Sequence, residues 1–276
     1  MNAKSEMMRD RLTLLDFSGH RREDFLSKMP MSVGFNPRQN RLLGALPAAE
    51  LNLLIANLKL IPMPRGKVIY ESGVESKHVY FPAASCIVSM LHVMEDGACA
   101  ETATVGNEGM VGVTSFMGGG TTASHAIVQS AGHAFQLAVE TLKKDFSRLT
   151  GLQHLLLCYT QALIRQMSQT AVCNRHHSVE QQLCRFLLSS VDRLSTNELI
   201  MTQELIASML GVRRECVTGA AGKLQARGFI SYSRGRITVI DRSGLEAQVC
   251  ECYAVVKKEY DRLLPDKPAS LRVGAR

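Results

Sequence analysis

The sequence lacks long apolar runs. No stretch of its 276 residues approaches the roughly 20 consecutive apolar residues that a transmembrane helix needs. The first residues, MNAKSEMMRDRLTLLDF, contain no apolar core of the kind that a secretory signal peptide carries. We therefore expect no signal peptide, no membrane partner and a cytoplasmic location.

A disulfide framework is also missing. The eight cysteines are scattered, at positions 86, 99, 158, 173, 184, 216, 250 and 252. Without a secretory leader they indicate reduced thiols. Cys250 and Cys252 are two residues apart, which is a poor spacing for a tetrahedral zinc site, so packing explains them better. His176 and His177 are adjacent, but no nearby ligands complete a site, and an exposed hinge is the better interpretation. We predict no metal site.

Signatures of catalysis are absent as well. Gly118–Gly120 are not followed by the Gly-Lys-Ser/Thr of a phosphate-binding P-loop. We find no nucleophile–base pair and no catalytic residue to name. We therefore expect that the protein is not an enzyme; an enzyme regulated by a β domain is the alternative from a different class.

The composition indicates a globular protein with a polyanionic partner. The chain is 46% hydrophobic and 21% charged, and it is long enough for two modest domains with separate cores. The net charge of +7 and the pI of about 9.1 favour a partner such as nucleic acid.

The first half of the chain changes from an irregular segment to a β pattern. Residues 1–40 are polar and irregular, and we predict a flexible tail. Pro47 opens a short amphipathic helix. Between residues 60 and 140, short β-branched runs alternate with glycine-containing turns, which predicts a sandwich or β-roll. Asp96-Gly97 predicts a hairpin turn between two of its strands.

Residues 151–177 have the periodicity of one long helix. Its apolar stripe consists of Leu152, Leu156, Tyr159, Leu163 and Met167. The stripe could pack on the β domain, or it could pair with its copy in a homodimer. The sequence leaves both open, and we take these five residues as the candidate dimer interface.

The segment 202–224, TQELIASMLGVRRECVTGAAGKL, predicts two short helices joined by a turn. It follows a helix that Ser178 and Gln181 open with a capping box. Thr202 is a good N-cap, and Gly211 can adopt the positive φ that ends the first helix. The second helix has a buried face at helical spacing, formed by Val217, Ala220, Ala221 and Leu224.

The opposite face of this second helix carries few side chains. It presents Glu215, Thr218, Gly219 and Gly222, with Arg213 and Arg214 at its N-terminal end. A helix-turn-helix inserts such a helix into the major groove with its N-terminal residues at the base edges. The segment GFISYSRGRITVID predicts a two-stranded wing. The candidate DNA-binding residues are Thr202, Gln203, Arg213, Arg214, Glu215, Thr218, Lys223, Arg234 and Arg236.

After the wing, Ser243 and Glu246 form a second capping-box pattern. It opens a helix with Leu245, Val249, Cys252, Val256, Tyr260 and Leu263 on one stripe. We expect this helix to pack on the winged domain, with a dimer or partner contact as the alternative.

These segments together resemble the Crp/Fnr family of bacterial transcription regulators, over about residues 41–242. Within the helix-turn-helix, the residues that match the family pattern without gaps are Thr202, Gly211, Arg214, Glu215, Val217 and Leu224. The resemblance implies an α+β fold. It has a β-roll (a cyclic-nucleotide-binding-like jelly roll) as effector domain at 41–150 and a dimerisation helix and hinge at 151–177. A winged helix-turn-helix at 178–242 follows, and residues 243–276 add a C-terminal helix and tail.

The function that the resemblance implies is regulation of transcription. A homodimer would bind a pseudo-palindromic site in double-stranded DNA, controlled by an effector in the β-roll, with RNA polymerase as a candidate partner. Arg214 should contact a guanine and Glu215 a cytosine amino group, pairings that donor and acceptor geometry also favour. Many relatives carry arginine where this chain has Gly219, so one contact to DNA is missing here. Gly219 and Gly222 each also cost the helix roughly 0.8–1 kcal/mol relative to alanine.

The predicted effector pocket departs from that of cyclic-nucleotide-binding relatives. It lies in NEGMVGVTSFMGGGTTASHAIVQ, with Glu108, Val113, Ser124 and His125 as candidate residues. Val113 stands where those relatives have a glutamate, and Ser124–His125 where they have an arginine and a hydroxyl residue. Burying a phosphate without a cation is expensive, and His125 is charged only when protonated. These departures argue against cyclic AMP or cyclic GMP.

No cofactor is identified from the sequence. An iron–sulfur cluster would need cysteines near the N-terminus, but the first cysteine is Cys86. Haem ligation by His92, His125 or His133 stays open. The alternative functions are a cyclic-nucleotide-responsive regulator with an atypical pocket and a ligand-binding module that does not bind DNA.

Overall fold

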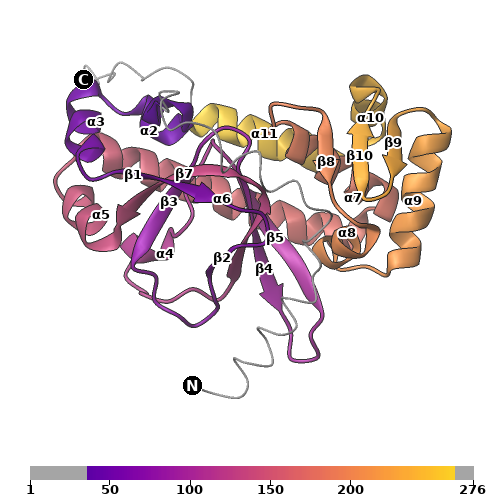
Figure 1. Cartoon of the computed structure of the whole chain (residues 1–276), viewed down its shortest axis with the longest axis horizontal. Helices are drawn as coiled ribbons and strands as arrows, with labels where there is room; N and C mark the ends of the chain where they lie inside the picture. The colour runs from indigo at the N-terminus through magenta and orange to yellow at the C-terminus, as the bar shows by residue number, and fades with distance from the viewer. Residues whose placement is uncertain (1–35, 265–276) are drawn as a thin grey trace, which may run out of the picture.

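Two antiparallel sheets form the N-terminal part of the computed structural model, which describes residues 36–264 (Figure 1). One sheet has the strand order β1–β7–β3, and the other has the order β2–β6–β4–β5. The strands are β1 (Lys59–Met63), β2 (Val68–Tyr70), β3 (His78–Pro82), β4 (Ile87–Val93), β5 (Cys99–Val105), β6 (His125–Ser130) and β7 (Gly132–Ala138). The expected α+β fold with an N-terminal β-roll is confirmed. The Asp96-Gly97 turn joins β4 to β5, with the Asp96 carboxylate accepting a hydrogen bond from the Ala98 amide.

Short helical segments border this β domain. They are the 3-10 turn η1 (Pro37–Gln39), α2 (Arg41–Ala45), α3 (Ala48–Ile55), α4 (Thr114–Met117) and α5 (Val139–Phe146). Residues 36–40, which we assigned to a flexible tail, belong to the ordered domain. Asn40 is fully buried, caps α2, and donates to the carbonyl oxygens of Pro82 and Gly109 at 3.0 and 2.8 Å. The rest of the expected tail lies outside the described residues.

The long helix α6 (Thr150–His176) runs along the β domain (Figure 1). The candidate dimer stripe does not face outward: Leu152, Leu156, Tyr159 and Leu163 are buried in the core of their own chain, and Met167 packs against that core. Tyr159 donates to the Met110 carbonyl oxygen at 2.9 Å. The dimer assignment of this stripe is therefore wrong, and the alternative, packing on the β domain, is confirmed. Periodicity identified the apolar face but could not identify its partner.

A second row of apolar side chains lies on the other face of α6. Leu157, Ile164 and Val172 are 53%, 55% and 49% exposed. Their spacing of seven and eight residues keeps them on one side of the helix.

The C-terminal domain begins at α7 (Val179–Val191), which the Ser178–Gln181 capping box opens as predicted. It continues with β8 (Glu198–Ile200), α8 (Gln203–Leu210), α9 (Arg214–Ala226), β9 (Ile230–Ser233) and β10 (Arg236–Val239). The wing has three strands, in the order β8–β10–β9, rather than the two that we predicted. The additional strand comes from the short segment before α8, where Leu199 pairs with Ile237.

The chain after the wing forms two helices rather than one. They are α10 (Arg242–Gln248) and α11 (Glu251–Leu263). The predicted capping box at Ser243 is wrong, because Asp241 caps α10 by accepting from the Gly244 amide. Most of α11 packs on α6, where the Tyr260 hydroxyl donates to Gln166 Oε1 at 2.8 Å. The expected packing on the winged domain is confirmed for Leu245 of α10, for Val249 and for Tyr253 in the first turn of α11.

The winged domain packs directly on the sheet that contains β4 and β6. Leu91 of β4 and Ile127 of β6 are buried in the hydrophobic core of the winged domain. Beside them, Arg193, in the segment after α7, forms an ion pair with Glu108 of the β domain at 2.8 Å. Their side chains are only 10% and 8% exposed, so water screens the pair little. Within the described residues, no helix is long and apolar enough to cross a membrane.

The buried ion pair predicts a large effect of Arg193→Met on stability. The variant leaves the Glu108 carboxylate buried without a cation, so the free energy of unfolding should fall by about 3–5 kcal/mol. Urea denaturation, followed by circular dichroism at one protein concentration, measures this change. Arg262→Met, which removes an exposed ion pair with Glu259, is the control and should change stability little. The double variant Glu108→Gln/Arg193→Met should recover part of the loss; equal stability of the Arg193 and Arg262 variants would contradict the prediction.

Candidate nucleic-acid interface

The two helices α8 and α9 have the predicted boundaries because local signals set each end. The Thr202 hydroxyl oxygen accepts from the Leu205 amide at 3.2 Å, which confirms Thr202 as the N-cap of α8. Gly211 ends that helix with φ of 66°, the left-handed region in which glycine has no steric penalty. Arg213 then precedes the first turn of α9. These boundaries fix which residues lie at the N-terminal end of α9.

The predicted buried face holds α9 against α7 and α8. Val217, Ala220, Ala221 and Leu224 are all buried in the core of the winged domain. Because this face is anchored, the other side of α9 stays at the surface. Arg213, Arg214, Glu215 and Thr218 are all exposed there, which puts two cations, an anion and a hydroxyl at one end of the helix.

The exposed side chains on α8 and α9 contact one another. The Thr218 hydroxyl group lies 2.7 Å from Gln203 Oε1 and 3.1 Å from the Arg214 carbonyl oxygen. Arg214 Nε lies 3.9 Å from Glu204 Oε2, and both of these side chains are largely exposed. A long ion pair in water contributes little. The Arg214 guanidinium can therefore exchange this partner for a stronger one at little cost.

The remaining cations of the predicted interface lie in different settings. Arg234 is exposed at the β9–β10 turn, with φ of 49°. Arg236 forms an ion pair with Glu198 of β8, and Lys223 lies 3.7 Å from Glu180 of α7. The sequence reasoning missed both glutamates, because no local pattern joins residues 180 and 223 or residues 198 and 236.

Space around the two glycines of α9 is open. A Cβ atom added at Gly219 or at Gly222 would meet nothing within 4 Å. Neither glycine is therefore required for packing within the chain. The surface beyond the first turn of α9 is short of side chains that could contact a partner.

The four candidate effector residues have separate environments. Glu108 is engaged with Arg193 and accepts from the Gly106 amide, and Val113 is buried in the core of the β domain. Ser124 lies within hydrogen-bond distance of the Thr122 hydroxyl. Burial lowers the pKa of His125, with Glu71 opposing this shift, so the imidazole offers no cation at neutral pH. Apart from the peptide bond between Ser124 and His125, the contacts described for residues 36–264 do not join any two of the four.

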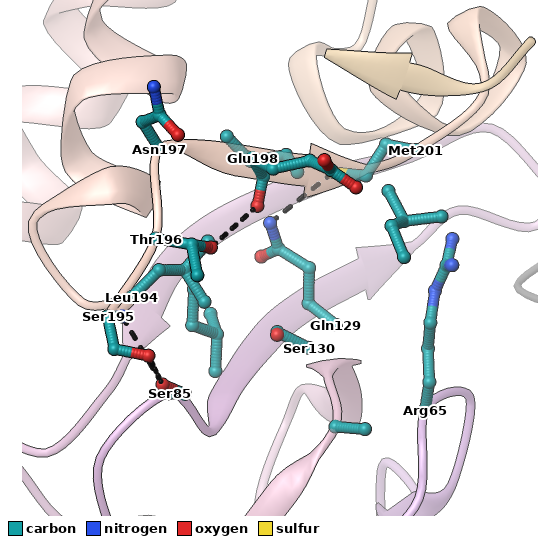
Figure 2. A pocket seen from close by; sticks show the side chains of 14 residues that line it. Arg65, Ser85, Gln129, Ser130, Leu194, Ser195, Thr196, Asn197, Glu198 and Met201 are labelled. Carbon is teal, nitrogen blue, oxygen red and sulfur yellow. Dashed lines mark hydrogen bonds between the residues drawn. The ribbon is translucent and has the colours of Figure 1, made fainter. Parts of the chain in front are cut away.

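A groove of about 530 Å³ lies between the β domain and the segment that leads into β8 (Figure 2). In its wall, Gln129 Nε2 lies 3.4 Å from Met201 Sδ, and the hydroxyl oxygens of Ser85 and Ser195 are 2.7 Å apart. A second cavity, of about 450 Å³, lies between the β4–β5 hairpin and α8. None of the four candidate effector residues lines either cavity.

One group of metal-ligand side chains lies away from this interface, at the junction of α6 with α11. It comprises Cys173, His177, Cys250 and Cys252, with ligand atoms all within 4.8 Å of one another. His177, for which the sequence indicated no nearby ligand, thus lies beside three cysteines, while the prediction of no metal site stays a prediction. Cys173 and His177 are more than 70 residues away from Cys250 and Cys252 in the sequence. Cys173 and His177, four residues apart in a helical segment, were the one local signal.

Comparisons with known proteins agree with the helix-turn-helix arrangement of α8 and α9. The sequence model of the Crp-like helix-turn-helix domain matches residues 181–248. The Global nitrogen regulator of Synechococcus elongatus is 25% identical over 201 residues, which cover 69% of this chain and 90% of that protein.

Two solved structures share the fold. FixK2 from Bradyrhizobium japonicum has 16% identity and a TM-score of 0.58, covering 70% of this chain and 98% of its own. A transcriptional regulator of the CRP/FNR family from Thermus thermophilus has 18% identity and a TM-score of 0.54, covering 69% and 97%. Residues 181–248 are therefore a Crp-like helix-turn-helix domain, and the described part of the chain has the fold of these regulators.

Proposed function

We propose that the protein acts as a homodimer that binds a pseudo-palindromic DNA site and reads each half-site with the N-terminal end of α9. The observation that carries the proposal is the exposure of Arg213, Arg214, Glu215 and Thr218 on a helix whose other face is anchored in the domain core. A recognition helix held in this way lies in the major groove, with its N-terminal residues at the base edges.

The side chains at this end suit base recognition. A guanidinium can donate two hydrogen bonds to guanine O6 and N7, and a carboxylate can accept one from the cytosine amino group. Arg214 and Glu215 therefore suit a G·C or C·G pair, and Arg213 adds a positive charge at the entrance to the groove. The contact of Thr218 with Gln203 braces the first turn of α9 against α8.

Phosphate contacts would supply most of the affinity. Thr202 and Gln203 lie at the N-terminus of α8, where backbone amides and the helix dipole favour an anion. Arg234 lies at the tip of the wing, and Arg236 and Lys223 would exchange an acidic neighbour for a phosphate. Since Gly219 and Gly222 present no side chains, we infer a short base-specific core in each half-site.

The dimer would form through the exposed face of α6. Leu157, Ile164 and Val172 form an apolar row along a helix of 27 residues. Exposed apolar side chains that recur every two turns on one side of a long helix are typical of a surface that a second copy covers. A symmetric pair of these helices would place two copies of α9 for two half-sites.

Effector control would act through the contact between the two domains. The predicted effector stretch, residues 107–129, supplies Glu108, Ile127 and Gln129 to that contact. A ligand that shifts this stretch would therefore disturb the packing of the winged domain. The four candidate pocket residues do not identify the ligand.

The base-recognition proposal predicts that Arg214→Ala/Glu215→Ala weakens binding to specific DNA. Each good base contact contributes about 1–3 kcal/mol, so Kd should rise at least about tenfold. DNA fragments that co-purify with the protein provide the site, and fluorescence anisotropy measures the affinity. Glu140→Ala/Lys144→Ala, an exposed pair on α5, is the matched control. Equal affinity of the recognition variant and the wild type would point instead to a ligand-binding module without DNA recognition.

Replacing Gly219 by arginine should add a contact to DNA. The open space around Gly219 admits the side chain, and its charge faces the proposed groove. A new phosphate contact should steepen the dependence of log K on log salt by about 0.9, and a new base contact should alter the preferred site. Gly219→Ala is the control, since it improves the helix without adding charge. If both variants bind DNA alike, α9 is placed incorrectly.

The dimer proposal predicts that Leu157→Glu/Ile164→Glu produces monomers. Two carboxylates on the apolar row would lie against each other across a symmetric interface. Light scattering after size-exclusion chromatography measures the mass at fixed concentration. Leu53→Glu, at a side chain of α3 that is 57% exposed, should leave the dimer intact. A monomeric wild type, or a variant that stays dimeric, would exclude this interface.

A further inference from the structure

Three cysteines and one histidine converge where the end of α6 meets the start of α11. Cys173 lies in the last turn of α6 and His177 at its C-cap, so the two side chains project from one side of the chain. Cys250 is the N-cap of α11, and Cys252 lies in its first turn. Four potential ligands from two distant segments thus surround one point.

Two of the distances between these groups match a tetrahedral site, and all of the ligand atoms lie within 4.8 Å of one another. Cys173 Sγ and Cys250 Sγ are 3.6 Å apart, and Cys252 Sγ lies 3.5 Å from His177 Nδ1. Tetrahedral zinc bonds of about 2.3 Å to sulfur and about 2.05 Å to nitrogen place two sulfurs about 3.8 Å apart and sulfur and nitrogen about 3.6 Å apart. The side chains therefore need little movement to meet one ion.

The site is shielded from solvent. Cys173, Cys250 and Cys252 are buried and form a small cluster of their own, separate from the cores of the two domains. The His177 side chain is 16% exposed. Four protein ligands with this degree of burial leave no open position for a substrate, which is typical of a structural metal site rather than a catalytic one.

Neighbouring groups orient the ligands. His177 Nε2 lies 3.3 Å from Glu251 Oε2, so the carboxylate can hold the proton on Nε2 and turn the lone pair of Nδ1 toward the sulfurs. Gln169 Nε2 lies 3.1 Å from Cys252 Sγ and can donate to a thiolate. The His177 backbone is held on both sides: its amide donates to the Cys173 carbonyl oxygen, and its carbonyl oxygen accepts from Gln182.

We propose that Cys173, His177, Cys250 and Cys252 bind one Zn²⁺ ion in a closed Cys₃His site that fastens α11 to the end of α6. On binding, the three thiols lose their protons to solvent and the histidine binds as neutral imidazole. Sulfur and imidazole ligands in tetrahedral arrangement select zinc over magnesium or calcium. The site does not depend on the proposed DNA recognition.

The position of the site gives it a mechanical role. His177 directly precedes Ser178, where α7 and the winged domain begin. An ion at this point would fix the direction in which the chain leaves α6. It would also fasten the start of α11 to the end of α6, next to the residue where the winged domain begins.

Metal analysis of the full-length protein tests the proposal. The chain is purified under reducing conditions, supplied with Zn²⁺ and desalted. Inductively coupled plasma mass spectrometry then measures the amount of zinc per chain. We expect one zinc per chain. Replacement by Co²⁺ should give the intense visible absorption of a tetrahedral ion and a sulfur-to-cobalt charge-transfer band. A wild-type chain that holds no metal, or whose Cys173 and Cys250 form a disulfide under these conditions, would overturn the proposal.

Variants locate the ion. Cys250→Ser/Cys252→Ser should lose the zinc, whereas Cys216→Ser, at an exposed thiol on α9, should retain it. His177→Cys tests whether the double variant loses zinc only because it misfolds. A Cys₄ site should still hold the metal, and its cobalt spectrum should shift toward that of four thiolates. Chelation should lower the Tm of the wild type and of Cys216→Ser, and leave that of the double variant unchanged. Zinc retained by the double variant would place the ion elsewhere and refute the site.

Discussion

A buried ion pair between Glu108 and Arg193 holds the winged domain on the β domain. Taking the Glu108 carboxylate and the Arg193 guanidinium out of water costs several kcal/mol for each ion, and only their mutual attraction and further hydrogen bonds offset this. Arg193 also lies within hydrogen-bond distance of the carbonyl oxygens of Ser189 and Thr104. Leu91 of β4 and Ile127 of β6 add an apolar contact between the same two domains. The position of α9 relative to the β domain follows from this contact.

The helix-turn-helix could be predicted from the sequence because its signals are local. A hydroxyl N-cap at Thr202, a glycine at the C-cap and an apolar face at helical spacing act within one or two turns, so their outcome depends little on the rest of the chain. The capping pattern at Ser243 shows the limit of such signals. Asp241, two residues earlier, caps the same helix, and a motif match could not decide between two competing side chains.

Contacts between distant segments could not be predicted in the same way. The stripe from Leu152 to Leu163 is apolar whether it packs on a sheet or on a second helix, and only the fold shows that α11 and the β domain already cover it. The four potential metal ligands fall into two pairs more than 70 residues apart. For Glu108, the resemblance indicated an effector pocket, and no local pattern could indicate its ion pair with Arg193, which lies 85 residues later in the chain.

The glycine that ends α8 is constrained twice. Its φ of 66° suits glycine, and asparagine is the usual substitute at such a position. Here, however, a Cβ atom at Gly211 would lie 3.3 Å from the Cβ of Ala100 in the β4–β5 hairpin. The position therefore requires a residue without a side chain for two reasons, the backbone conformation of the turn and the short distance to the hairpin. A larger side chain at this position would press the helix-turn-helix against the hairpin, so this one residue links the shape of the turn to the packing of the two domains.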